Sequence, residues 1–250
     1  MLKNSLLVLL SFLFSAQALS ASELRVAMSA DYPPLHFKQD GKFYGVEPDN
    51  ARAIGEIIRR RIRIVELPFA ELMPALLEGK VDVIMSGLSV TQERAKRVQF
   101  IDSYLDVGQM AIMHRDKLNS FAQPWAIYRA GARIGVEPNT TGAEFAEQKL
   151  PDALIRYFED AEAAFAGLRG DEIDLYIHDA PTSWRLASTM EDDDLISLYN
   201  RLTEEELAWA VRPDDTELAT ALNAGLTLMR SNGTLQYILN RWIPVQVEVN

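Results

Sequence analysis

The chain has 250 residues and no cysteine, and its 36 acidic against 25 basic residues give a formal net charge of −11. This acidity argues against nucleic acid and anionic membrane surfaces as partners, and the lack of cysteine excludes disulfides and a lipidated thiol. The length allows one large domain or two modest ones.

The N-terminus has the pattern of a secretory signal peptide. Lys3 precedes an apolar run over residues 6–14, and small residues follow it. This run is shorter than the roughly 20 residues that span a bilayer, and no second run as long and uncharged follows. We expect residues 1–21 to be removed by cleavage after Ala18 or Ala21, although an uncleaved anchor is the alternative. The mature chain is then a periplasmic monomer that is not embedded in the membrane.

Short apolar strands alternate with amphipathic helices in two series. The first series predicts strands at 24–28, 62–67 and 81–85 and helices at 49–60 and 69–78. The second series predicts strands at 133–136, 154–158 and 173–177, a helix from about 141 and a helix at 161–169. This βαβα order is typical of a mainly parallel sheet, so the sequence predicts an α/β fold with two lobes.

The two series share a repeated phrase, at residues 70–84 and 161–177, in which a helix stops at a glycine and a buried strand follows. Chance similarity between two α/β units is the alternative explanation. A third copy is absent from the C-terminal part, which predicts a strand at 207–211 and helices at 216–230 and 234–242. We expect this part to return and complete the first lobe.

Polar residues follow the first repeated strand, where open α/β sheets place their ligands. Ser86, Gly87 and Ser89 lead into a predicted helix with Thr91 as N-cap and Arg94 in the first turn. Free amides and a guanidinium at such a corner suit a carboxylate. A capped helix with a surface arginine is the alternative.

Further candidate residues lie in the other lobe and around the strand starts. Thr140 and Thr141 stand at a second strand-to-helix corner, where they either meet the same anion or simply cap a helix. Asp179, which comes directly after the second repeated strand, either holds an ammonium or caps the next helix. Tyr32 and Phe69 either wall a ligand or belong to the core.

Enzyme signatures are thin. The three histidines are isolated, and the His-Glu-x-x-His, Gly-x-Ser-x-Gly and phosphate-loop patterns are absent. We therefore expect no metal, no cofactor and no catalytic residue.

Together these features resemble the family 3 extracellular solute-binding proteins, which bind polar amino acids and serve ABC importers. The marks of the resemblance lie at residues 25–34, 45–49, 74–82, 87–94, 140–142 and 232–234. The resemblance implies the two-lobed type II periplasmic binding protein fold, with the ligand in a cleft and two crossing hinge strands near 111–115 and 207–211. Lobe 1 would then comprise 22–112 and 209–250, and lobe 2 would comprise 113–208.

The resemblance also implies roles for the residues of the clamp. Arg94, Ser89 and Thr141 would take the α-carboxylate of the amino acid. Asp179, together with Ser89, would take its α-ammonium. The ABC permease would be the protein partner that receives the ligand.

Position matching within the family places other residues along the ligand. Tyr32 and Phe69 would flank its stem, and Ser29, Glu137 and His178 would lie toward its side chain. Because a carboxylate at Glu137 repels acidic ligands, we expect arginine, lysine, histidine or glutamine to bind better than glutamate or aspartate.

The chain departs from the common family pattern at two places. Leu35 and His36 stand where Phe-Glu is common, and residues 46–48 stand where Phe-Asp-Val is usual. We expect neither departure to touch the clamp residues, although Leu35 bears on the wall of the pocket.

Two rival functions belong to other classes. Cyclohexadienyl dehydratases resemble the same family and use a glutamate three residues beyond the aspartate as proton donor, but Thr182 stands there in this chain. A threonine has no suitable pKa for a general acid, which disfavours the enzyme. The other rival is a sensor whose closed form docks on a membrane signalling partner.

Overall fold

The structure of the protein is a computed structural model that describes residues 22–121, 123–188, 192–198 and 200–243. The predicted signal peptide and both predicted cleavage points lie outside the described residues. Within the described part, none of the helices has the length and apolar character needed to cross a bilayer.

The first lobe is built on a five-stranded sheet with the order β5-β1-β6-β15-β7. Its strands are β1 (Glu23–Met28), β5 (Arg61–Glu66), β6 (Val83–Ile84), β7 (Gln99–Phe100) and β15 (Ala210–Val211). β1 pairs in parallel with β5 and β6, whereas β15 returns from the C-terminal part and pairs antiparallel with β6 and β7. The C-terminal part therefore contributes a strand to the sheet of the first lobe.

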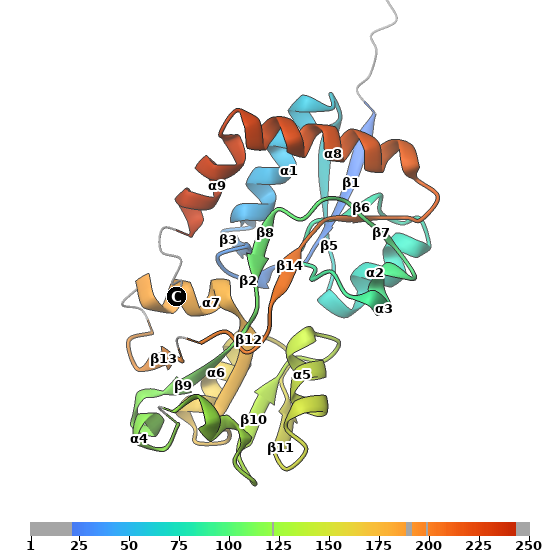
Figure 1. Cartoon of the computed structure of the whole chain (residues 1–250). Coiled ribbons are helices and arrows are strands. Elements are labelled where there is room, and N and C mark those ends of the chain that lie inside the picture. Colours follow the sequence, from blue (N-terminus) through green and yellow to red (C-terminus); the bar gives the residue numbers. More distant parts are fainter. Residues whose placement is uncertain (1–21, 122, 189–191, 199, 244–250) are drawn as a thin grey trace, which may run out of the picture.

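Helices pack on this sheet and on one another, as Figure 1 shows in the upper half of the molecule. They are α1 (Val46–Ile57), α2 (Phe69–Leu77), the short α3 (Gln92–Ala95), α8 (Thr216–Ser231) and α9 (Thr234–Trp242). A small antiparallel sheet of β2 (Asp31–Tyr32), β3 (His36–Gln39) and β4 (Lys42–Tyr44) adjoins α1. Its first strand brings Tyr32 to the side of the lobe that faces the second lobe.

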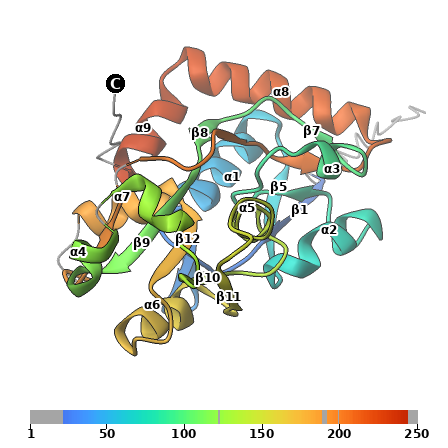
Figure 2. The same ribbon diagram turned by 60° about the horizontal axis from the view of Figure 1, so that its bottom comes forward.

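The second lobe has its own five-stranded sheet, with the order β11-β10-β12-β9-β13. Its strands are β9 (Gln109–His114), β10 (Arg133–Val136), β11 (Leu154–Tyr157), β12 (Leu175–Asp179) and β13 (Leu195–Ser197). The accompanying helices are η1 (Arg115–Lys117), α4 (Leu118–Phe121), η2 (Pro124–Tyr128), α5 (Thr141–Lys149), α6 (Ala161–Arg169) and α7 (Ala180–Ser188). The turned view in Figure 2 brings this lobe forward.

The repeated phrase of the sequence corresponds to a repeated contact. In the first lobe, the backbone N–H and the guanidinium of Arg25 donate to Asp82, with Nη2 2.6 Å from Oδ1. In the second lobe, Arg133 donates to Asp174 from the same groups, again with Nη2 2.6 Å from Oδ1. Each aspartate precedes the strand that pairs with the arginine's strand. The same contact at the same structural point in both lobes argues against chance similarity.

Two antiparallel strands, β8 (Leu105–Val107) and β14 (Glu205–Leu207), run between the lobes. They appear in green and orange at the centre of Figure 1. Just beyond β8, a Cβ added to Gly108 would lie 1.9 Å from the carbonyl oxygen of Thr203. The two crossing segments are thus in direct backbone contact, and only glycine fits at this point.

The positions of both crossings correct the sequence prediction. Of the expected second crossing at 207–211, only Leu207 belongs to a crossing strand, and Ala210–Val211 form β15 of the first sheet. β9 is an inner strand of the second sheet, paired with β12 on one side and β13 on the other, so residues 111–115 do not cross between lobes. The apolar run at 110–113 would suit a crossing strand and a core strand equally well, which explains the error. We therefore propose lobe boundaries at the β8–β14 pair, a few residues before the expected ones.

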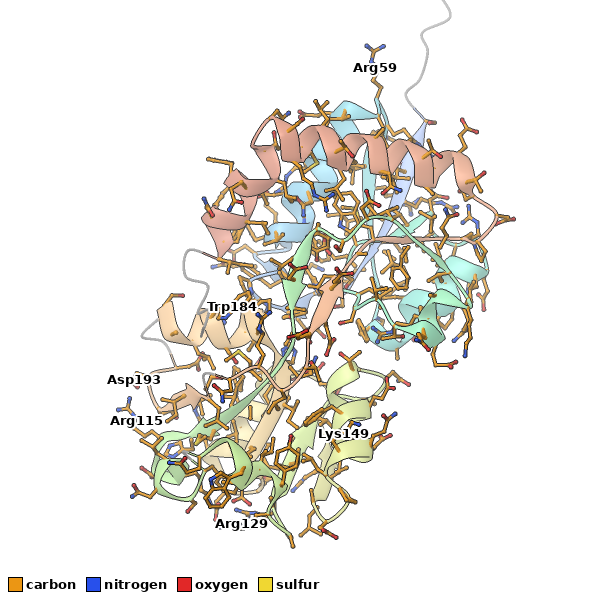
Figure 3. All side chains as sticks on the ribbon, viewed as in Figure 1. Arg59, Arg115, Arg129, Lys149, Trp184 and Asp193 are labelled. Atoms are coloured by element: carbon orange, nitrogen blue, oxygen red, sulfur yellow. The ribbon has the colours of Figure 1, made fainter. Side chains whose placement is uncertain are left out.

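The lobes also meet at α7. Trp184 of this helix is 5% exposed and belongs to the same buried apolar cluster as Met28 and Leu35 of the first lobe. Figure 3 shows Trp184 between the two halves of the molecule, whereas Arg59 and Arg129 project from opposite ends. The two lobes are thus in contact with each other through Trp184 in this structure.

Candidate ligand-binding site

A cavity lies between the lobes, at the carboxyl ends of the central strands of both sheets. Its lining residues come from both lobes: Ser29, Asp31, Tyr32, Phe69, Gly87, Ser89, Arg94, Gln109, Glu137, Thr140, Thr141, Ile177, His178 and Asp179. All the ligand residues predicted from the sequence are among them except Ser86. The carboxyl ends of strands are where open α/β sheets place their ligands.

The corner that carries Arg94 is built as the sequence predicts. Thr91 caps α3 and accepts a hydrogen bond from the Arg94 N–H at 3.1 Å. The guanidinium donates to the Ser89 carbonyl at 2.9 Å and, across the cleft, to the Asn139 carbonyl at 3.0 Å. It also lies 5.8 Å from the ring centre of Phe69.

Arg94 lacks a carboxylate partner in the part of the chain that the structure describes. Among the described residues, no ion pair joins its guanidinium to an acidic side chain, and burial lowers its pKa from the usual value. Arginine stays protonated even so, because its ordinary pKa lies far above neutral pH. The cavity therefore contains a fixed positive charge without an anion.

Asp179, the last residue of β12, is the negatively charged counterpart of Arg94 in the cavity. Its carboxylate accepts a hydrogen bond from the Tyr32 hydroxyl of the other lobe at 2.8 Å and one from the Gln109 amide. Burial raises the pKa of Asp179, and the nearby charge of Glu205 adds to this, whereas the two hydrogen bonds oppose it. No cation pairs with Asp179 among the residues described. The cavity thus also contains a carboxylate without a cation, and together with Arg94 it can complement a zwitterion.

The end of the cavity at Glu137, which we call its far end, is acidic. Glu137 accepts a hydrogen bond from the Tyr176 hydroxyl, and its carboxylate lies 3.5 Å from Nε2 of His178. Burial raises the pKa of Glu137, while His178 and the Tyr176 hydrogen bond oppose the shift. With the exposed Asp31, the lining holds three carboxylates against one guanidinium, which favours a ligand that carries an extra positive charge.

Ser86 lies behind the cavity and does not line it. The residue is 1% exposed, and its hydroxyl oxygen accepts a hydrogen bond from the Ser29 N–H at 3.0 Å. His36 stands next to both serines, with Nδ1 3.2 Å from the Ser29 carbonyl and Nε2 3.3 Å from the Ser86 hydroxyl. Because a carbonyl can only accept, Nδ1 carries the hydrogen and Nε2 accepts from Ser86. Burial lowers the pKa of His36 to about 4, so this imidazole is neutral at pH 7.

Glu47 supports the same loop from below. Its carboxylate is fully buried and accepts from the Gly87 N–H at 3.0 Å, the Tyr104 hydroxyl at 2.8 Å and Nε1 of Trp209 at 3.0 Å. Gly87 has a φ of +59°, and a Cβ there would lie 3.0 Å from the Tyr32 ring. Only glycine combines this conformation with this close approach.

The departures at 35–36 and 46–48 contact residues next to the clamp rather than the four clamp residues Arg94, Ser89, Thr141 and Asp179 themselves. His36 contacts Ser29 and Ser86, and Glu47 binds Gly87. The start of α1 packs beneath the 86–89 loop, and nothing in the spacing along the chain indicates this. Leu35 is fully buried and does not line the cavity.

Replacing Glu47 with glutamine is expected to destabilise the protein by about 1–3 kcal/mol, because an amide NH₂ would face one of the three donors and leave it unsatisfied. Burial raises the pKa of Glu47, but its three hydrogen-bond donors all require an acceptor. Thermal or urea unfolding measures the effect. Glu56→Gln, an exposed change on the same helix, is the control. Equal stability of both variants would show that the Glu47 contacts contribute little.

Three lining residues were not predicted from the sequence: Asp31, Gln109 and Ile177. Asp31 follows the first strand directly before Tyr32, and this adjacency is a signal that could have identified it. Gln109 lies at the start of an otherwise apolar strand, and Ile177 is one apolar residue among several. No local pattern distinguishes these two.

Comparison with known proteins agrees with this geometry. The profile of the bacterial extracellular solute-binding proteins, family 3, matches residues 24–245. The chain is 28% identical to ABC transporter arginine-binding protein 1 of Escherichia coli (strain K12), over 95% of this chain and 96% of that protein.

Solved structures are similar over most of the chain as well. An ancestral amino acid-binding protein, a precursor of cyclohexadienyl dehydratase, has a TM-score of 0.83 at 30% identity and covers 89% of this chain and 96% of its own. A mutant of ArgBP from T. maritima has a TM-score of 0.82 at 28% identity and covers 90% and 96%. The chain therefore belongs to the bacterial extracellular solute-binding proteins, family 3.

Proposed function

We propose that this protein captures a cationic amino acid, arginine or lysine, in the cavity between its lobes and delivers it to the permease of an ABC importer. The observation that carries the proposal is a pair of charges that form no ion pair within the described ranges, the guanidinium of Arg94 and the carboxylate of Asp179. A free amino acid supplies both missing partners, a carboxylate and an ammonium.

The proposed pose follows from the two corners. The ligand's carboxylate lies between the Arg94 guanidinium, Ser89 and the start of α5 at Thr141, where free N–H groups favour an anion. Its ammonium lies against Asp179 and Ser89.

The stem of the ligand passes the rings of Tyr32 and Phe69. Its side chain then points toward Ser29, His178 and Glu137, with Asp31 at the same end. The surplus of carboxylates at this end favours a guanidinium or ammonium over an acidic group.

The relatives support the same reading. The similar protein of Escherichia coli is named as arginine-binding, and the two similar structures are of an ancestral amino acid-binding protein and of an ArgBP mutant. Proteins of this family are extracellular, which accords with the expected signal peptide and a periplasmic location for this chain. Histidine and glutamine are expected to bind more weakly than arginine and lysine, because their side chains lack a full positive charge at neutral pH.

The residue at the dehydratase position also supports a binding protein. Thr182 is 2% exposed, and its hydroxyl lies 3.0 Å from Nδ1 of His178. It has no ionisable proton in the relevant range and is already engaged by a protein partner.

A thermal-shift screen of the twenty amino acids tests the proposal. Arginine or lysine is expected to raise the melting temperature most, because a ligand at 100 times its Kd stabilises the folded state by about 2.7 kcal/mol. Glutamate and aspartate should produce no shift. A chain stabilised by none of the twenty would contradict the proposal.

Glu137→Gln should reduce the preference for cationic ligands. Removing one of the carboxylates at the far end takes away attraction for arginine and repulsion of glutamate, so the ratio of their affinities should fall by about tenfold or more. Calorimetric titration of arginine, glutamine and glutamate into both proteins measures this. Glu147→Gln, an exposed change in α5, is the matched control. An unchanged preference would remove Glu137 from the pocket.

A further inference from the structure

Gln109 connects the ammonium corner to the strands that join the lobes. It is 1% exposed and begins β9, immediately after the first crossing. Its Nε2 lies within hydrogen-bond distance of Asp179, 3.0 Å from Oγ1 of Thr141 and 3.2 Å from Oε1 of Glu205. Because carboxylate oxygens only accept, these neighbours place the NH₂ group of the amide on this side.

Glu205 is the second carboxylate of this network. It begins β14, the other crossing strand, and accepts from the hydroxyls of Thr141 and Thr203, both at 2.7 Å. Over the described residues, it forms no ion pair with a cation, and it does not line the ligand cavity. Its negative charge therefore acts on the ligand site from behind, through Gln109 and Asp179.

We propose that Gln109 is a positioning residue that bridges Asp179 and Glu205 and keeps Asp179 ionised and oriented toward the ligand's ammonium, while Glu205 on the crossing strand tunes that charge. The inference rests on the proposed function, since it assumes that Asp179 holds an ammonium. It adds a role for two residues that contact the clamp from the hinge side.

The physical basis is the repulsion between two carboxylates. Two like charges disfavour each other's ionised form, and a hydrogen-bond donor placed between them relieves this. Removing the donor should make Asp179 harder to ionise, and removing the charge of Glu205 should make it easier. The two changes thus have opposite signs, whereas a general loosening of the site would act in one direction only.

Other groups that face Asp179 must stay constant in the test. They are Tyr32 of β2, Arg94 of α3, Tyr104 before β8, Glu137 after β10, and Tyr176 and His178 of β12. None of them is altered in the variants Gln109→Met and Glu205→Gln, so differences in pH dependence report the two changed residues.

The experiment is calorimetric titration of L-arginine at a series of pH values from about 4 to 8, which brackets the ionisation of carboxylates with raised pKa values. Binding should weaken as the pH falls and Asp179 becomes protonated. In Gln109→Met, the affinity at neutral pH should fall about tenfold to hundredfold, and the loss should begin at a higher pH than in the wild type. In Glu205→Gln, the loss should begin at a lower pH.

Glu206→Gln provides the matched control, since it removes the same charge from the next residue of the same strand, where the side chain is exposed. The acid limb of its binding curve, which is the loss of affinity as the pH falls, should coincide with that of the wild type. If Gln109→Met does not fold, Glu205→Gln carries the test alone, because a downward shift cannot arise from general damage. Acid limbs that shift in the same direction, or not at all, overturn the inference while the proposed function stands. A wild-type protein that binds no amino acid at any pH overturns both.

Discussion

Arg94→Ala is expected to abolish measurable binding of the amino acid. Removing one partner of a desolvated charge pair costs about 2 to 5 kcal/mol, which corresponds to roughly 30-fold to 5,000-fold in affinity. The guanidinium is held in place by the Ser89 and Asn139 carbonyls, and it forms no ion pair with a carboxylate in the part of the chain that the structure describes. Calorimetry with the best ligand measures the loss.

Arg97→Ala is the control for this variant. Arg97 lies three residues beyond Arg94 and is exposed, so its removal takes the same charge from the same segment without touching the cavity. Its affinity should equal that of the wild type. If Arg94→Ala also binds normally, the corner is only a capped helix, and the ligand binds elsewhere.

Asp179→Asn is expected to weaken ligand binding about as much as Arg94→Ala does. It is not expected to lower the stability of the unliganded protein. The ligand's ammonium loses its counter-charge, which costs about 2 to 5 kcal/mol of binding free energy. Without ligand, the folded protein should unfold at the same or a higher temperature. An asparagine can still accept from Gln109 and donate to the Tyr32 oxygen.

The sign follows from the raised pKa of Asp179. A carboxyl group whose pKa is higher in the folded than in the unfolded state penalises folding at every pH above its unfolded value, and the penalty disappears as the pH falls below that value. Asparagine removes the penalty at pH 7. Asp152→Asn, an exposed change in the same lobe, should alter neither property. An Asp179→Asn protein that binds arginine normally would remove Asp179 from the ammonium site.

Local patterns in the sequence predict the elements that position the site. The two strand-to-helix corners are marked by caps at Thr91 and Thr140, and both side chains accept the expected backbone hydrogen bond. The apolar strand before Asp179 ends where an open sheet places its ligand. Because each signal involves only a few consecutive residues, it can be recognised in the sequence without knowledge of the fold.

The supporting residues have no such signal. Glu47 and His36 act by packing beneath loops that are far away in the chain, and Gln109 acts by facing the other crossing strand. Long-range contacts of this kind depend on how α1 and β14 sit against the sheets. The position of the crossing failed for the same reason, since pairing partners decide whether an apolar run such as 110–113 belongs to a hinge or a core.

A crystal structure of the protein with L-arginine tests the central claim most directly. We predict that the ligand lies between the lobes, with its carboxylate on Arg94, its ammonium on Asp179, and its guanidinium toward Glu137 and Asp31. The residues that line the cavity here should surround it. Arginine bound outside this cavity, or bound with its guanidinium at Asp179 and its ammonium at the far end, would contradict the account.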